Sequence, residues 1–176
     1  MAVRFIETHE LLHLADHLAG RESGPGAPRT IYLRRSISTA YYALFHKLGQ
    51  HASLRLVGDG PWTPKHAALT RWITHTELAV LSNAANGLGN KALVAMLDPV
   101  DARLANISQN FIDLQDARHG ADYDDLFAVS KSFALSYVDA ARSAAEAADE
   151  LYESREPSYM RFLGLSFGGV KVAKSR

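Results

Sequence analysis

The chain has 176 residues, of which 47% are hydrophobic and 22% are charged, as in an ordinary globular domain. Its 19 basic residues are balanced by 19 acidic ones, so any surface that binds a polyanion must be local. The absence of cysteine excludes disulfides and thiolate metal sites and fits a cytoplasmic protein, and no apolar stretch approaches the roughly 20 residues that span a bilayer.

The first predicted helix runs from about Thr8 to Gly20, where a glycine can adopt the left-handed cap. Residues 20–28 are rich in glycine, serine and proline and predict a loop. A second helix is expected from about Arg29 to Ser53. At about 100° per residue, one of its sides is apolar and predicts the face toward the core: Leu33, Ile37, Ala40, Tyr41, Leu44 and Leu48.

The middle of the chain predicts three further helical stretches. One starts at Thr63-Pro64, because an N-cap residue followed by proline favours a helix start. Between residues 78 and 97, asparagines and glycines interrupt the apolar residues and indicate a broken helix. The next helix is expected to open at Asp98-Pro99 and to stop at Gly120, with a core stripe of Leu104, Ile107, Phe111 and Leu114.

The last long helix is expected to begin between Asp122 and Asp125 and to end before Pro157. Its predicted apolar face comprises Leu126, Val129, Phe133, Ala140, Ala144, Ala147 and Leu151. No window alternates with the two-residue period of a strand. The sequence therefore predicts an all-α fold, an antiparallel up-down bundle of four to six helices formed by residues 1–156. Residues 157–176 are expected to form a tail that either docks on the bundle or is disordered.

A second stripe lies on the second predicted helix. Its residues follow helical spacing and share one ridge: Arg35, Thr39, Tyr42 and His46. In one interpretation, Tyr42 and His46 cover a contact with another helix and keep their polar tips in water. In the other, the ridge is a dimer surface or a wall that contacts nucleotide, where tyrosine stacks on a base and arginine meets a phosphate.

Arg118 occupies an unusual place for an arginine. It lies four residues after Leu114, so its side chain is expected to project along the core-facing ridge. A charge there needs a partner or a function. The architectural explanation is that Arg118 offsets the dipole of the last helical turn, that Gly120 is the C-cap, and that Asp122 caps the next helix and pairs with Arg118.

Two motifs in this order resemble the HEPN superfamily. They are Ser-x-Ser-x-Ala-Tyr-Tyr-Ala-x-Phe-His at positions 36–46 and Arg-x-x-Ala-Asp-Tyr at positions 118–123. The resemblance implies a compact antiparallel helical bundle, often a homodimer, in bacterial toxin–antitoxin or defence modules alongside nucleotidyltransferase partners. It also implies a metal-independent ribonuclease, whose catalytic arginine is followed four to six residues later by histidine and meets its copy across the dimer interface.

By this resemblance Arg118 matches the catalytic arginine, while Tyr123 occupies the nearest matching position in the sequence. Tyrosine has an ordinary pKa of about 10 and is a poor general base near neutrality. The degenerate pair is therefore expected to bind RNA or a nucleotide without efficient cleavage, unless His46 or His119 substitutes in space. The expected ligand site comprises Arg118, Asp122, Tyr123, Arg35, Tyr42 and His46.

The alternative function is a non-catalytic interaction module that recruits a nucleotidyltransferase or another partner. Convergence of Arg34, Arg35 and Arg118 on one cleft would favour binding of nucleic acid, and scatter would favour recruitment. No cofactor is expected. No metal is expected either, because the three histidines spaced by four residues lie about 160° from the apolar stripe of their helix and face solvent: His9, His13 and His17.

Overall fold

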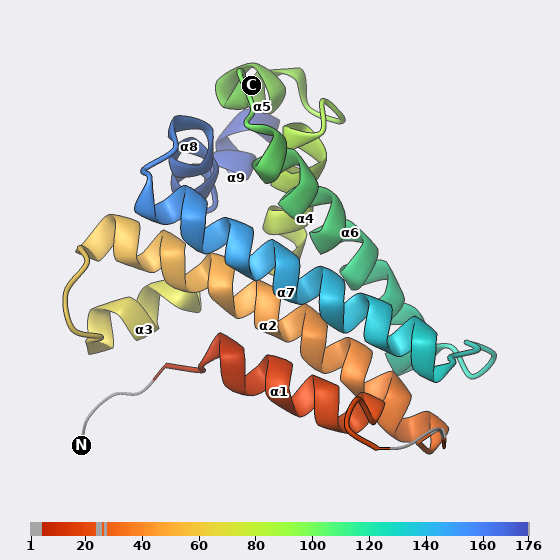
Figure 1. Cartoon of the computed structure of the whole chain (residues 1–176). Helices are drawn as coiled ribbons and strands as arrows, with labels where there is room; N and C mark the ends of the chain where they lie inside the picture. Colours follow the sequence, from red (N-terminus) through yellow and green to blue (C-terminus); the bar gives the residue numbers. More distant parts are fainter. Residues whose placement is uncertain (1–4, 24–25, 27, 176) are drawn as a thin grey trace.

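The computed structural model describes residues 5–23, 26 and 28–175, and the regular structure in these ranges is helical (Figure 1). The prediction of an all-α fold is confirmed. In chain order the helices are α1 (Thr8–Ala19), α2 (Thr30–Val57), α3 (Pro64–Thr70), α4 (His75–Ala85), α5 (Lys91–Leu97), α6 (Ala102–Tyr123), α7 (Lys131–Glu153), α8 (Pro157–Leu165) and α9 (Gly169–Lys174).

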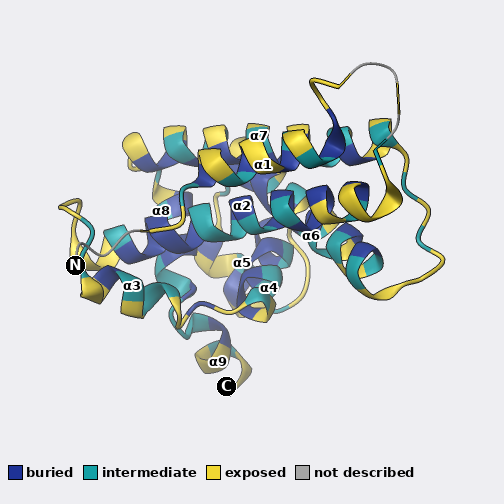
Figure 2. Ribbon diagram, turned by 90° about the horizontal axis from the view of Figure 1, so that it is seen from below, coloured by how far each residue is buried: buried dark blue, intermediate teal, exposed yellow. Residues whose placement is uncertain are grey.

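The four long helices α1, α2, α6 and α7 form an up-down bundle, with successive members running in opposite directions (Figure 1). α2 lies at its centre and contacts α1, α3, α6, α7 and α8. For this reason α2 is buried or half-buried along most of its length, whereas α1 keeps an exposed outer face (Figure 2). The short helices α3, α4 and α5 connect α2 to α6.

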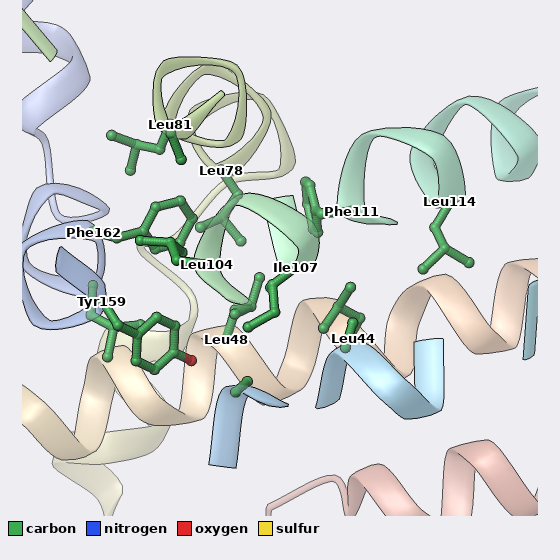
Figure 3. Packing of buried hydrophobic residues seen from close by; sticks show 14 of the residues in the cluster. Leu44, Leu48, Leu78, Leu81, Leu104, Ile107, Phe111, Leu114, Tyr159 and Phe162 are labelled. Atoms are coloured by element: carbon green, nitrogen blue, oxygen red, sulfur yellow. The ribbon is translucent and has the colours of Figure 1, made fainter. Parts of the chain in front are cut away.

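The main core joins α2 and α6 to the short helices. Figure 3 shows Leu44 and Leu48 of α2 packed against Ile107 and Phe111 of α6, with residues of α4 and α8 closing the other side. All four of these side chains are at most 1% exposed. Burying a side chain of this size stabilises the fold by about 1.5–3 kcal/mol, so burial of the predicted stripes stabilises the packing of α2 against α6.

Side-chain caps set the starts of α6 and α7, and both starts differ from the predicted ones. Asp101 accepts a hydrogen bond from the backbone N–H of Arg103 at 2.8 Å, so α6 begins after Asp101 and not at Asp98-Pro99. Ser130 accepts from the backbone N–H of Phe133 at 3.1 Å and starts α7. Each cap satisfies an N–H that the first helical turn leaves unpaired.

The junction between α6 and α7 differs from its prediction. α6 continues through Gly120 to Tyr123, so Gly120 is not its cap, and α7 begins at Lys131 and not between residues 122 and 125. Gly120 has another role, a close approach: a Cβ at Gly120 would lie 2.7 Å from Cε2 of Phe127. Gly120 lets the segment 124–130 fold back so that the Phe127 ring lies against the helix backbone.

The buried face of α7 agrees with the predicted one at Ala144 and Leu151 and is rotated from it near the start of the helix. Leu126 lies outside the helix and is 90% exposed, and Phe133 is exposed as well. The residues that α7 buries are Ala134, Val138, Ala141, Ala144, Ala145, Ala148, Leu151 and Tyr152. Small alanine side chains let α7 approach α2 closely. The face that carries these alanines is therefore the buried one, although larger apolar side chains lie on the adjacent face.

The predicted break within residues 78–97 separates α4 from α5. Gly87 and Gly89 have φ values of 75° and 83°, which glycine adopts without strain. Beyond residue 156, the chain docks on the bundle: Tyr159 and Phe162 of α8 and Val170 of α9 are buried in the main core. Within the described ranges, no helix has the length and apolar character needed to cross a membrane.

Candidate functional site

Arg118 lies on α6 with its guanidinium turned toward α2. The guanidinium carbon is 5.5 Å from the ring centroid of Tyr41 and 5.3 Å from that of Tyr42. The side chain is 19% exposed, and its Nε donates a hydrogen bond to Oδ2 of Asp122 at 3.1 Å. Cation–π contact with two rings and a charge-assisted hydrogen bond stabilise the partly buried charge and fix its direction.

Asp122 connects the two motifs. Besides Arg118, its carboxylate accepts hydrogen bonds from Nη1 of Arg35 at 3.3 Å and from Oγ of Ser38 at 2.6 Å. The expectation that Asp122 caps the last helix is wrong, because Asp122 lies in the last turn of α6 and Ser130 caps α7. Two guanidinium groups share one carboxylate, so the cluster of Arg35, Arg118 and Asp122 carries a net positive charge.

A further histidine, which no sequence motif marks as a site residue, belongs to this site. His75 is the first residue of α4, and its Nδ1 is 2.6 Å from the hydroxyl of the fully buried Tyr41. The amide of Gln115 approaches the same hydroxyl at 3.5 Å. The sequence marks a helix start near Thr74 through its N-cap, but it carries no signal that this start lies beside Tyr41.

The hydrogen bond from Tyr41 sets the tautomer of His75. Burial raises the pKa of the Tyr41 phenol well above its ordinary value, so the hydroxyl keeps its proton. Because the Gln115 amide is also placed to donate to the phenolic oxygen, we infer that the hydroxyl donates to Nδ1 of His75. The neutral imidazole then carries its hydrogen on Nε2 and presents a hydrogen-bond donor.

His46 and Tyr42 lie on the same side of the molecule as His75. The ring centroid of Tyr42 is 6.2 Å from that of His46 and 5.9 Å from that of His75, and Phe45 stacks on His75 at 3.9 Å. Burial lowers the pKa of His46, and burial followed by the charge of Arg118 lowers the pKa of His75. Both imidazoles are therefore neutral at pH 7.

The two histidines open onto a hollow of about 350 Å³ between α2 and the α3–α4 segment. Phe45 and His46 line it from α2, and Thr70, Arg71 and His75 line it from the other side. The Arg118 cluster thus continues through aromatic rings into a concave surface that has room for a small ligand.

Tyr123 lies apart from this arrangement. It is 68% exposed, and its ring lies 5.1 Å from the ring of His119. Because α6 remains helical through residue 123, positions 118 and 123 are separated by about 140° around the helix axis, and Tyr123 faces away from the ridge of Arg118. The structure brings together Arg118, Asp122 and Arg35, with Tyr42 and His46 alongside, but not Tyr123.

Arg34 has an architectural role. It donates hydrogen bonds to the carbonyl oxygens of Ala121, Asp125 and Phe127 at 3.3, 3.1 and 2.9 Å. The three arginines considered in the sequence analysis therefore do not meet in one cleft. Arg35 and Arg118 meet at Asp122, whereas Arg34 holds the segment that follows α6.

In the part of the chain that the structure describes, no group of three or more histidine, aspartate or glutamate residues is placed to hold a metal ion. His9 pairs with Glu7 at 3.2 Å on the exposed side of α1. Comparisons of the chain with protein-family models, with curated proteins and with solved structures found no match.

Proposed function

We propose that this chain is a HEPN-like helical domain that binds RNA or a nucleotide through Arg118, as a toxin-like component of a bacterial toxin–antitoxin or defence module in the cytoplasm. The observation that carries the proposal is the position of the Arg118 guanidinium. It is held by Asp122 over Tyr41 and Tyr42, and the Tyr42 ring in turn lies beside the neutral imidazoles of His46 and His75.

These groups suit a phosphorylated ligand. Arg118 and Arg35 supply guanidinium donors, and their positive charge exceeds the single negative charge of Asp122. Nε2 of His75 supplies an uncharged donor, and the half-buried Tyr42 offers an aromatic surface for a base.

The same groups are poorly suited to rapid cleavage. His75 presents an N–H at Nε2 and so cannot accept a proton there, and Tyr123 faces away from Arg118. His46 is neutral at pH 7 and is the residue that would accept a proton if RNA were cut. We therefore propose a site that binds RNA and has little ribonuclease activity without metal.

The homodimer implied by the HEPN resemblance belongs to the same proposal. Tyr123 and Leu126 are 68% and 90% exposed at and just after the end of α6, and in this proposal a second copy covers them. The second candidate function is a module that recruits a nucleotidyltransferase or another protein, and the same exposed residues would serve it. It is favoured by Arg34, which binds backbone carbonyls and so does not join Arg35 and Arg118 in one cleft.

A binding experiment separates the two functions. Fluorescence anisotropy with labelled single-stranded RNA is measured for the wild type, Arg118→Ala, Tyr123→Ala and the control Arg103→Ala, which removes an arginine near the start of α6. Under the first proposal, Arg118→Ala weakens binding at least tenfold while the other two variants bind like the wild type.

Thermal unfolding shows whether each variant is folded, and gel electrophoresis shows whether the RNA is cut. Equal RNA affinity in all four proteins would contradict the proposed RNA site. If Tyr123→Ala instead abolished a stable dimer or a complex with a partner, while RNA binding was absent throughout, the recruitment function would replace it. Cleavage to cyclic-phosphate ends would show that a competent base is present.

A further inference from the structure

The hollow beside His75 continues along α3. A neighbouring hollow of about 280 Å³ lies between α2 and α3 and reaches Phe5 and Trp62. The two hollows share His46, Thr70 and Arg71. We call this continuous surface, from His75 to Trp62, the α2–α3 groove.

The α2–α3 groove is suited to an anion. Among the described residues, no aspartate or glutamate lines either of its hollows, and the guanidinium of the exposed Arg71 makes no hydrogen bond or ion pair with any of them. A third hollow of about 420 Å³, bordered by α1, α2 and α7, has charges of both signs in its lining: Glu7, Glu146 and Asp149 with Lys47 and Arg142. Arg71 is therefore the charged side chain at the groove with no carboxylate beside it in the lining.

Aromatic rings lead from this groove to Arg118. The ring of Tyr42 lies between the Arg118 guanidinium, at 5.3 Å, and the His46 ring, at 6.2 Å. His46 in turn lines both hollows of the groove. A chain of phosphates and bases leaving Arg118 would therefore pass Tyr42 and His46 before it reached Arg71, alternating cations with aromatic surfaces as sites for single strands do.

We propose that the α2–α3 groove is a second phosphate subsite, in which Arg71 binds a phosphate of a single-stranded RNA that also occupies the Arg118 site. This inference rests on the proposed function and narrows its ligand from RNA or a nucleotide to an RNA strand. A mononucleotide fills one subsite, whereas a strand of several nucleotides engages both cations. Affinity should therefore increase with length until the groove is filled.

The test compares ligand lengths and charge variants. Anisotropy is measured with labelled oligouridylates of two, four and eight nucleotides, and uridine monophosphate is measured by competition, each between 50 and 300 mM salt. The proteins are the wild type, Arg71→Ala, Arg71→Lys, Arg118→Ala and the control Lys91→Ala, which removes an exposed charge from α5. Because Arg71 is exposed, its variants should have the same melting temperature as the wild type.

We expect Arg71→Ala to weaken binding of the eight-nucleotide strand about fivefold and to reduce the slope of log affinity against log salt by about 0.7, the loss of one phosphate contact on a single strand. Arg71→Lys should keep the slope. Uridine monophosphate should bind Arg71→Ala as it binds the wild type, and Lys91→Ala should change nothing.

The outcomes separate this inference from the proposed function. If the eight-nucleotide strand binds no more tightly than the monophosphate, or if Arg71→Ala leaves its affinity and salt slope unchanged, the groove subsite is rejected while an Arg118-dependent site stands. If strand binding depends on Arg71 but not on Arg118, the groove stands and the Arg118 site is rejected. If the wild type binds none of the ligands, both are rejected.

Discussion

The hydroxyl of Tyr41 and Nδ1 of His75 share a hydrogen bond of 2.6 Å that ties the middle of α2 to the first turn of α4. Tyr41 is fully buried, and His75 lies at the wall of the hollow. A residue of the core is thus hydrogen-bonded to a residue at the candidate site, and we infer that it favours the tautomer of His75 with hydrogen on Nε2.

Replacing Tyr41 with phenylalanine tests this relationship. Tyr41→Phe removes the donor and leaves Nδ1 of His75 without its partner, so we expect the free energy of unfolding to fall by about 1–2 kcal/mol. In ¹⁵N NMR spectra, wild-type His75 should show the tautomer with hydrogen on Nε2, and the variant should show a mixture. The control is Tyr32→Phe, at an exposed tyrosine near the start of α2. Identical His75 spectra in the two variants would contradict the assigned tautomer.

Arg34 and Arg35 are adjacent arginines with different expected contributions to stability. Arg34→Ala removes three hydrogen bonds to backbone carbonyls of residues 121–127, and we expect a loss of about 1–3 kcal/mol. Arg35→Ala breaks an ion pair whose arginine is 62% exposed, and we expect less than about 1 kcal/mol. Denaturant unfolding measures both. Hydrogen exchange should accelerate in residues 124–130 for Arg34→Ala alone, and equal losses in both variants would contradict this division.

Gly120 and Phe127 are expected to be energetically coupled. Gly120→Ala places a Cβ where the Phe127 ring lies, and overpacking of this kind costs about 1–3 kcal/mol. The double variant Gly120→Ala/Phe127→Ala should lose less than the sum of the two single changes, because removing the ring makes room for the methyl group. A double-mutant cycle by chemical denaturation measures the coupling. Strict additivity would show that Gly120 is present for another reason.

Stability should fall on mild acidification. Burial lowers the pKa of His46, His51 and His75 in the folded chain, so below the ordinary histidine pKa of about 6.5 the unfolded chain binds more protons than the folded one. The free energy of unfolding should be level above about pH 7 and decrease as the pH falls below about 6.5. Urea unfolding between pH 5 and 8 measures this dependence.

The most deeply buried of these histidines should account for part of the dependence. His51→Gln should give a smaller change in stability between pH 8 and pH 5 than the wild type, whereas His9→Gln, at an exposed histidine, should leave the change as it is. A wild-type stability that increases on acidification would contradict the lowered pKa values.

The sequence by itself determined which residues of α2 and α6 face the core, because these follow from helical periodicity. The stripe that includes Leu44 on α2 and the stripe that includes Phe111 on α6 are both buried, because residues three and four apart share a face wherever the backbone is helical. The same rule placed Arg118 on the inward ridge, four residues after Leu114, and the left-handed cap at Gly20 follows from local backbone freedom.

Only the tertiary structure decided which distant groups meet. His75 lies 34 residues from Tyr41 in sequence, and Asp122 lies 87 residues from Arg35, so no local pattern contains these contacts. Packing also overrode local expectation at the end of α6: Phe127 returns onto Gly120, the helix continues to Tyr123, and helical geometry turns that side chain away from Arg118. Periodicity fixes the faces of each helix, but long-range packing sets where helices end and which residues form the candidate site.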